Sequence, residues 1–379
     1  MSVTVTIAGA GISGLVLGRC LQQRGIKAIL YEKSKPLTAT NRNNYGITLQ
    51  ATSYRPLLRI LGLEEGAFRR KVAVDGAVGG TGRVVVVGGE DDGAFRANRN
   101  RLEGLLAEGL DVRWEREIQG VQASAEGEGM VEVEFSDGTK HQTRMLVGAD
   151  GVHSQVRKAT APEVGFKILP FAVYNGKRKM GADAFRCDLA PSFRDGNVLQ
   201  QRVGNVLLQV SINERTEDEV SVSYTYSRPA ASDDDPLYRP HRAKSEAREM
   251  PEVLFSEIDA LKGRLQEPYA AVFDSAAMKQ DRMLHWLMRT LRVEQHRVTK
   301  AVQDNIVLIG EAAHAEPILG GRGGSEAIED GMELALMLAE HGKNGLGKFL
   351  SNRKAFWDQG IQESEVGIAE MHGTSRSSL

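Results

Sequence analysis

Residues 3–33 read VTVTIAGAGISGLVLGRCLQQRGIKAILYEK, and this stretch decides the fold. Alternating apolar residues before Gly9 predict a strand, and the apolar spacing after Gly14 predicts a helix that ends at Gly25. Residues 26–31 predict a second strand. A strand, a glycine turn, a helix and another strand make a βαβ unit. The sequence therefore predicts an α/β fold that begins with a nucleotide-binding unit.

The glycine turn has the spacing Gly9-x-Gly11-x-x-Gly14, with Ile12 and Ser13 inside it. Such a turn lets a pyrophosphate approach the backbone and the positive end of the following helix. Glu32 ends the second strand and is suited to a ribose 2′-hydroxyl. An acidic residue there disfavours a 2′-phosphate, so NAD or FAD is expected in this pocket and NADP is not.

The composition excludes several other classes. The chain has 379 residues, 48 basic and 50 acidic, and a formal net charge of -2, so neither nucleic acid nor an anionic membrane is an expected partner. Cys20 and Cys187 are the only cysteines, which disfavours a disulfide framework and a thiolate metal site. No signal peptide or long apolar stretch is seen, so we expect a cytoplasmic protein. We also expect no metal and no obligate protein partner.

Two further motifs each follow a strand-like run. Residues 148–157 read GADGVHSQVR, and residues 310–330 read GEAAHAEPILGGRGGSEAIED. With the first glycine turn, they resemble the three motifs of the single-component (group A) FAD-dependent aromatic hydroxylases. That family has the p-hydroxybenzoate hydroxylase fold and includes fungal natural-product monooxygenases. The resemblance spans residues 3–331 in family order.

The resemblance implies a Rossmann-like FAD-binding domain with an inserted β-sheet substrate domain and C-terminal helices. We expect the first part of the FAD-binding domain at 1–164, with 73–94 contributing to the substrate side. A β-rich substrate domain is expected at 165–285, and the return segment with the helices at 286–379.

The same resemblance implies which residues hold FAD. They are Gly9, Gly11, Ile12, Ser13, Gly14, Glu32, Lys33, Arg42, Arg99, Asp150, Gly151, Gly310, Glu311, Pro317, Gly321, Gly323, Gly324 and Ser325. The chain departs from the family at Glu311, usually Asp, and at Ser325, often Asn. Arg322 is expected to bring a positive charge near the flavin, and His314 is expected to be structural.

The implied reaction is oxygenation with NAD(P)H and O2 through a flavin C4a-(hydro)peroxide. The substrate would be a small aromatic or olefinic compound that is hydroxylated or epoxidised, in natural-product metabolism. No second strand–GxGxxG–helix is present, so NADPH or NADH is expected to dock transiently. The flavin carries the chemistry, and no catalytic side chain is predicted. Tyr174, Tyr224, Tyr226 and Arg228 are the candidate substrate contacts.

Two alternatives stay open at this point. One is a flavin oxidoreductase of the same fold that does not oxygenate, such as a reductase or a halogenase. The isolated positions of Trp114, Trp286 and Trp357 count against a halogenase, whose motif pairs tryptophans. The other is a non-catalytic binding protein on the same fold. Flavin binding by the purified protein separates the last alternative from the rest.

Overall fold

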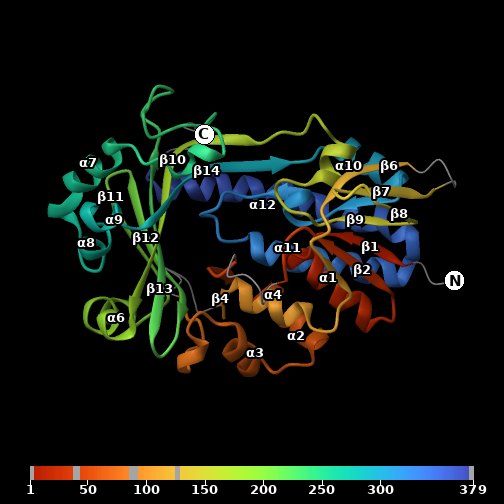
Figure 1. Ribbon diagram of the computed structural model, residues 1–379, viewed down its shortest axis with the longest axis horizontal. Helices are drawn as coiled ribbons and strands as arrows, with labels where there is room; N and C mark the ends of the chain where they lie inside the picture. The colour runs from red at the N-terminus through yellow and green to blue at the C-terminus, as the bar shows by residue number, and fades with distance from the viewer. Residues whose placement is uncertain (1–3, 37–42, 85–92, 124–128, 375–379) are drawn as a thin grey trace.

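A computed structural model describes residues 4–36, 43–84, 93–123 and 129–374 (Figure 1). Its strands are β1 Val5–Ala8, β2 Ala28–Glu32, β3 Gly46–Leu49, β4 Phe95–Asn98, β5 Val112–Trp114, β6 Ile118–Ala123, β7 Val131–Phe135, β8 Lys140–Thr143, β9 Leu146–Gly148, β10 Lys167–Gly181, β11 Val198–Val203, β12 Val206–Arg215, β13 Glu219–Pro229, β14 Arg282–Arg292, β15 Ile306–Leu308 and β16 His314–Ala315. Its α-helices are α1 Ile12–Gln23, α2 Ala51–Leu61, α3 Glu65–Val72, α4 Arg99–Ala107, α5 Gln155–Thr160, α6 Ala182–Asp188, α7 Glu252–Leu261, α8 Tyr269–Val272, α9 Ser275–Met278, α10 Gln295–Gln303, α11 Gly323–His341 and α12 Gly345–Met371.

The predicted βαβ unit is confirmed as part of a parallel sheet. Among the described residues this sheet has the strand order β15-β9-β1-β2-β5. Pairing is parallel between β1 and each of β2 and β9, and also between β15 and β9. The central strand β1 is buried along its whole length, as expected for a strand with neighbours on both sides. Segments at residues 5–8, 146–148 and 306–308 therefore end at one edge of one sheet.

Two helices, α2 and α3, follow β3 and are separated by a short segment that begins with a glycine. Gly62 ends α2 in the left-handed conformation, with φ 65°, and its N–H donates to Leu58 O. A glycine adopts this conformation without the steric cost that a Cβ brings, which makes it a common helix terminator. The helix α4 begins at Arg99, and the C-terminal helices that the resemblance implies include the long helix α12.

A second sheet is mainly antiparallel and has the order β11-β12-β13-β10-β14-β16 among the described residues. Its strands β12 and β13 pair antiparallel, with Leu208 opposite Tyr226. The sheet begins at Lys167 with β10, and β14 runs across the expected boundary between residues 285 and 286.

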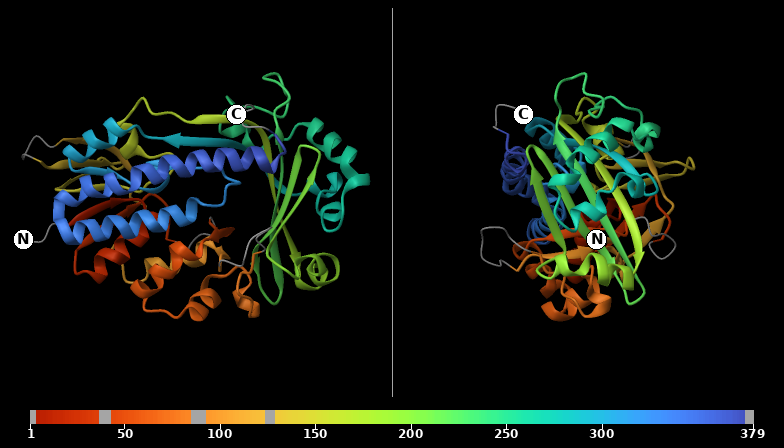
Figure 2. Two further views of the ribbon diagram at one scale, coloured as in Figure 1. Left: turned by 180° about the vertical axis from the view of Figure 1, so that it is seen from behind. Right: turned by 90° about the vertical axis from the view of Figure 1, so that its left-hand side faces the viewer.

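The second sheet is covered on both faces (Figures 1 and 2). We call the side packed against α6, α7, α8 and α9 the far face; its core includes Phe185, Phe255, Val272 and Met278. We call the other side the near face. It contacts α12 through Ile368 and lies toward the parallel sheet.

No helix in the described ranges combines the length and the apolar character needed to cross a membrane.

Candidate functional site

A cleft of about 320 Å³ opens at the carboxyl ends of β1, β2 and β9. Ligands of parallel α/β sheets bind at this edge, beyond the ends of the strands. The cleft is lined by Ala8, Gly9, Ala10, Gly11, Tyr31, Glu32, Lys33, Ser34, Lys35, Asn43, Tyr45, Arg99, Glu103, Trp114, Arg116, Glu117, Ile118, Ala149, Asp150, Gly151, Val152, His153, Gln155 and Glu311. Eight of the predicted cofactor residues are therefore brought together: Gly9, Gly11, Glu32, Lys33, Arg99, Asp150, Gly151 and Glu311.

The first glycine turn leaves no room for side chains on two of its glycines. Gly9 has φ 102°, and a Cβ there would lie 2.3 Å from Ala149 O. A Cβ on Gly14 would lie 2.2 Å from Gly9 O, which packs the helix start against the turn. Around Gly11 the space is open, and the nearest atom to a Cβ is Nη2 of Arg99 at 3.8 Å. The turn thus presents bare backbone, a helix N-terminus and a guanidinium to the cleft.

Glu32 is fixed at the rim of the cleft by two backbone groups. Its Oε2 accepts a hydrogen bond from Ala10 N at 3.0 Å, and its Oε1 accepts one from Ser34 N at 2.9 Å. Each carboxylate oxygen has a further lone pair. Glu32 therefore retains acceptor capacity for a ligand hydroxyl.

Arg99 begins α4 beside the glycine turn and is held by three contacts. Its backbone N–H donates to Tyr45 O at 2.9 Å, its Nε donates to Glu103 Oε1 at 2.8 Å, and its Nη1 donates to the Tyr45 hydroxyl. The Glu103 side chain is only 1% exposed. A buried carboxylate thus fixes a guanidinium over the place where a pyrophosphate would meet the helix.

Asp150 supplies a buried acceptor that has no donor among the described residues. Its Oδ2 accepts from Gln155 N at 2.7 Å and from Val156 N at 3.3 Å. Its Oδ1 is buried without a partner. Burial raises the pKa of Asp150 against the hydrogen bonds from Ser154 and from the backbone. Buried polar atoms nearly always have partners, so an orphaned oxygen on the cleft wall fits a ligand hydroxyl.

The residues of the third motif lie in two places, the cleft and the start of α11. The exposed Glu311 side chain lines the cleft. Gly310 has φ 58°, and a Cβ there would lie 2.8 Å from Ser13 Oγ, so these two predicted residues pack beneath the cleft. The helix start includes Gly323, Gly324 and Ser325.

The start of α11 lies against β3. A Cβ on Gly324 would lie 3.3 Å from Cδ1 of Ile47 and 3.4 Å from Cδ2 of Leu49. Ser325 Oγ accepts a hydrogen bond from Gln50 N at 2.9 Å, so this hydroxyl is already engaged with the chain. Nine predicted cofactor residues are outside the lining of the cleft: Ile12, Ser13, Gly14, Gly310, Pro317, Gly321, Gly323, Gly324 and Ser325.

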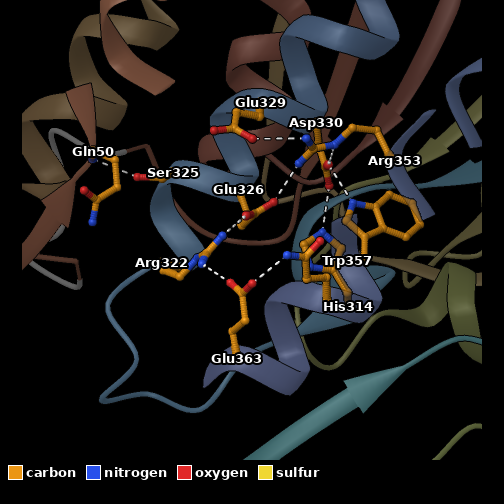
Figure 3. A network of polar contacts seen from close by, with 11 residues as sticks. Gln50, His314, Arg322, Ser325, Glu326, Glu329, Asp330, Arg353, Trp357 and Glu363 are labelled. Atoms are coloured by element: carbon orange, nitrogen blue, oxygen red, sulfur yellow. Dashed lines mark hydrogen bonds and ion pairs between the residues drawn. The ribbon is translucent and has the colours of Figure 1, made fainter. Parts of the chain in front are cut away.

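The positions of three other residues are also clear. Arg322 pairs with Glu326 on α11 at 3.3 Å and with Glu363 on α12 at 2.8 Å (Figure 3), so two carboxylates engage its charge, and a role beside the flavin stays a prediction. His314 is buried, and its Nε2 lies 2.9 Å from Asp330 Oδ2, as a structural residue should be. Arg42 lies outside the described residues.

The four candidate substrate residues lie on the far face of the second sheet. Tyr174 donates to Leu237 O at 3.1 Å, Tyr224 donates to Asp281 Oδ2 at 2.7 Å, and Tyr226 donates to Glu257. Arg228 is paired with Asp235 and Glu257. The structure does not bring these side chains to the cleft, and their positions argue against substrate contact, because the sheet separates them from it.

Sequence reasoning overlooked other residues around the cleft and on the near face. Trp114 ends β5, a strand beside β2 in the parallel sheet, and Arg116 lies just beyond it; both line the cleft. Their place at the carboxyl end of a strand was a usable signal. Asn175 and Thr225 are on the near face, each one residue from a chosen tyrosine, and they are joined by a 3.0 Å hydrogen bond.

Comparison with known proteins agrees with this geometry. A family profile described as an FAD binding domain matches residues 2–175 and 262–356. The FAD-dependent monooxygenase aptC of Emericella nidulans is 32% identical, over 98% of this chain and 96% of that protein. The FAD-dependent monooxygenase nscC of Neosartorya fischeri is 33% identical, over 96% of this chain and 92% of that protein.

Solved structures share the fold. The 2,6-dihydroxypyridine-3-hydroxylase of Arthrobacter nicotinovorans has a TM-score of 0.74 at 17% identity, covering 99% of this chain and 94% of that one. CtdE in complex with FAD and a substrate has a TM-score of 0.72 at 16% identity, covering 98% and 90%. The chain belongs to the FAD-binding-domain family and is an FAD-dependent monooxygenase.

Proposed function

We propose that the cleft binds FAD and that the bound enzyme uses NADPH or NADH with O2 to hydroxylate or epoxidise a small aromatic or olefinic compound. The observation that carries the binding site is the joint presence of the bare glycine turn, the guanidinium of Arg99 above it and the orphaned Oδ1 of Asp150. These three match a pyrophosphate and a sugar hydroxyl in chemistry. The bound FAD supplies the redox chemistry.

The side chains of the cleft would bind and orient the cofactor. Arg99 compensates phosphate charge at the N-terminus of α1. Glu32 and Asp150 accept hydrogen bonds from sugar hydroxyls, and Glu311 reaches into the same cleft from the end of β15. The N-terminus of α11 offers a positive dipole end that stabilises negative charge on the reduced ring system. Pro317 and Gly321 shape the turn that leads into this helix.

The near face of the second sheet is the proposed substrate wall. Gln209, Thr225 and Asn175 are cross-strand neighbours in one row of this face. The row nearer α12 is mostly apolar: it includes Leu207, Val173 and Trp286, and its one β13 member, Ser227, is engaged by His372. A wall with a polar row beside an apolar one suits a ring that carries oxygen substituents.

We propose a reducing compartment such as the cytoplasm. Both cysteines are free, and Cys187 is exposed. An exposed thiol persists unpaired where glutathione keeps thiols reduced. NADPH and NADH are also regenerated there.

The test is a flavin titration followed by a single turnover. Purified protein is loaded with FAD, reduced anaerobically with NADPH or NADH, and mixed with O2 in the presence of a panel of phenols and indoles. Faster flavin reduction with one compound, and a product heavier by one oxygen atom, are expected. A flavin that reoxidises without oxygenated product with every compound would favour a reductase. A protein that stays colourless would remove the proposed cofactor site.

A further inference from the structure

Arg96 lies where the β3–β4 hairpin meets the second sheet. It pairs with Thr48 across the hairpin. Its Nη1 donates to Thr48 Oγ1 at 3.2 Å, and its Nη2 donates to Ser211 Oγ on β12 at 3.3 Å. A Cβ on Gly46 would lie 2.5 Å from Arg96 Nε, so the glycine allows the guanidinium to cross that strand. The side chain thus spans from the unit that holds the cleft to the proposed substrate wall.

The guanidinium of Arg96 has no counter-ion among the residues that the structure describes. No carboxylate in the described part of the chain is within ion-pair distance, and its buried Nε has no acceptor. The two hydroxyl contacts are long for a charged donor. Burial lowers the pKa of Arg96 to about 10, against the influence of Tyr45, which raises it.

Two neighbouring arginines on the same segment, unlike Arg96, have carboxylate partners. Arg99 pairs with Glu103, and Arg101 pairs with Glu214, both at 2.8 Å. A charge removed from water is costly unless it is paired, so proteins supply acceptors to most such groups. Arg157, for example, donates to three carbonyl oxygens. Arg96 has only two long hydroxyl contacts and an orphaned Nε, which leaves it able to accept an anion from outside the chain.

The wall beside Arg96 is also basic. Ser211, Ser223 and Lys177 are neighbours in one row across β12, β13 and β10, and Arg282 continues the row on β14. Lys177 Nζ donates to Asn44 O at 2.7 Å, and within the described ranges no carboxylate pairs with it. Burial lowers the pKa of Lys177, and nearby Lys179 and Arg282 lower it further, against the smaller opposite effects of Glu214 and Glu219. An anionic group would be stabilised along this row.

We propose that Arg96 binds an acidic oxygen of the substrate, so that the substrate is an aromatic compound bearing a carboxylate or an ionised phenol or enol. This inference rests on the proposed function. The planar guanidinium offers parallel N–H donors that match such oxygens. The strand β3 also packs on the start of α11, where the proposed flavin ring would lie. A substrate whose acidic group is held by Arg96 at the hairpin therefore has its ring on the side of the proposed flavin site. Arg96 is therefore a specificity-determining residue.

The test compares Arg96→Gln and Arg96→Lys with the wild type and with Arg59→Gln, which removes an exposed arginine on α2. The probes are two matched pairs: 3-hydroxy-2-naphthoate with its methyl ester, and alizarin with its dimethyl ether. Binding is measured by the change in flavin absorption on FAD-loaded protein and by calorimetry on FAD-free protein. FAD affinity is measured separately for every variant.

Wild type and R59Q should bind at least one acidic probe more tightly than its methylated partner. R96Q should weaken the acidic probe by about 10- to 100-fold and leave the methylated one unchanged, with R96K in between. The probe pair whose acidic member loses affinity in R96Q shows whether the site binds a carboxylate or a phenolate. Equal loss for both members, a loss of FAD affinity in R96Q, or no preference in the wild type would each overturn the inference. Failure of the wild type to bind FAD, with the probe preference intact by calorimetry, would overturn the proposed function alone.

Discussion

Oδ1 of Asp330 on α11 accepts a hydrogen bond from Nε1 of Trp357 on α12, at 2.8 Å. The same fully buried carboxylate accepts from Arg353 Nε at 2.9 Å and from Gly310 N at 2.8 Å, with His314 Nε2 at 2.9 Å (Figure 3). One side chain thereby joins the end of β15, where the cleft begins, to both long C-terminal helices. Loss of this carboxylate should therefore affect the whole domain.

Low pH should weaken the interactions of Asp330 in a defined pH window. Burial acts to raise the pKa of Asp330, but His314, Arg353 and Gly310 N–H outweigh it and lower the pKa to about 2. A carboxyl whose pKa is lowered in the folded state stabilises it above the unfolded-state pKa and loses that contribution as pH falls through the folded-state value. Asp330→Asn should lower the free energy of unfolding by about 3–5 kcal/mol at neutral pH.

The difference in unfolding free energy between wild type and D330N should then shrink by about 2 kcal/mol between about pH 4 and pH 2. Urea denaturation across this range measures it, and the subtraction removes the contribution of other carboxyls. A difference that is constant with pH would show that the carboxylate charge is not what holds the network.

The crossing of α1 and α11 depends on Gly331. A Cβ at this position would lie 2.8 Å from Ser13 O and 2.9 Å from Leu17 N. Gly331→Ala should therefore force the helices apart and destabilise the protein by about 1–3 kcal/mol. Gly347→Ala on α12 is the matched control, because no atom lies within 4 Å of its Cβ. It should be neutral or stabilise by up to about 1 kcal/mol, as alanine does in helices. Thermal unfolding that ranks the two variants the other way would refute the close crossing.

Arg99 should affect FAD affinity separately from stability. Arg99→Met removes the proposed phosphate contact and should weaken FAD by about 10- to 100-fold. It also leaves Glu103 buried without its cation, which lowers stability. The double variant Arg99→Met/Glu103→Gln should recover stability, since the amide oxygen can still accept from Asn43, but not FAD affinity. Fluorescence titration with FAD, with exposed Arg70→Gln as control, checks this. Recovered affinity in the double variant would mean that Arg99 acts only through folding.

Substitution of Glu311, unlike that of Arg99, should change FAD affinity without changing stability. Its side chain is exposed in the cleft, so Glu311→Ala removes no packing. FAD should bind about 10-fold more weakly or worse, the cost of a lost charged hydrogen bond. Glu311→Asp, one methylene shorter, should lose less. Glu340→Ala at the exposed end of α11 serves as control. An unchanged FAD affinity in E311A would exclude Glu311 from the cofactor site.

Local sequence rules predicted the parallel sheet and much of the cleft. Gly9 and Gly11 follow β1 and Glu32 ends β2, so their positions are set by the βαβ unit itself. Contacts between residues far apart in the sequence are different. The pairing of Arg322 with Glu363, for example, joins the start of α11 to a residue 41 positions later on α12. No local spacing encodes such a contact.

There is a physical reason why the sequence pointed to far-face residues as substrate contacts. A strand alternates its side chains between two faces, but both faces of this sheet are buried, so polarity does not say which face is which. Tyr224 and Tyr226 have the aromatic bulk expected of a pocket, yet their hydroxyls are engaged by Asp281 and Glu257 on the far face. The smaller Thr225 between them is on the near face.

Two adjacent hydroxyl deletions test this assignment. Thr225→Val keeps the shape of the side chain and removes a near-face hydroxyl, while Tyr226→Phe removes a far-face hydroxyl one residue away. T225V should raise KM for the substrate or uncouple NAD(P)H oxidation from oxygenation, because the proposed wall loses a polar contact. Y226F should leave KM and coupling unchanged and cost about 1 kcal/mol of stability through the lost bond to Glu257. Steady-state kinetics with product quantification and urea denaturation measure both. If Y226F altered KM while T225V did not, the substrate would be on the far face and the proposed wall would be wrong.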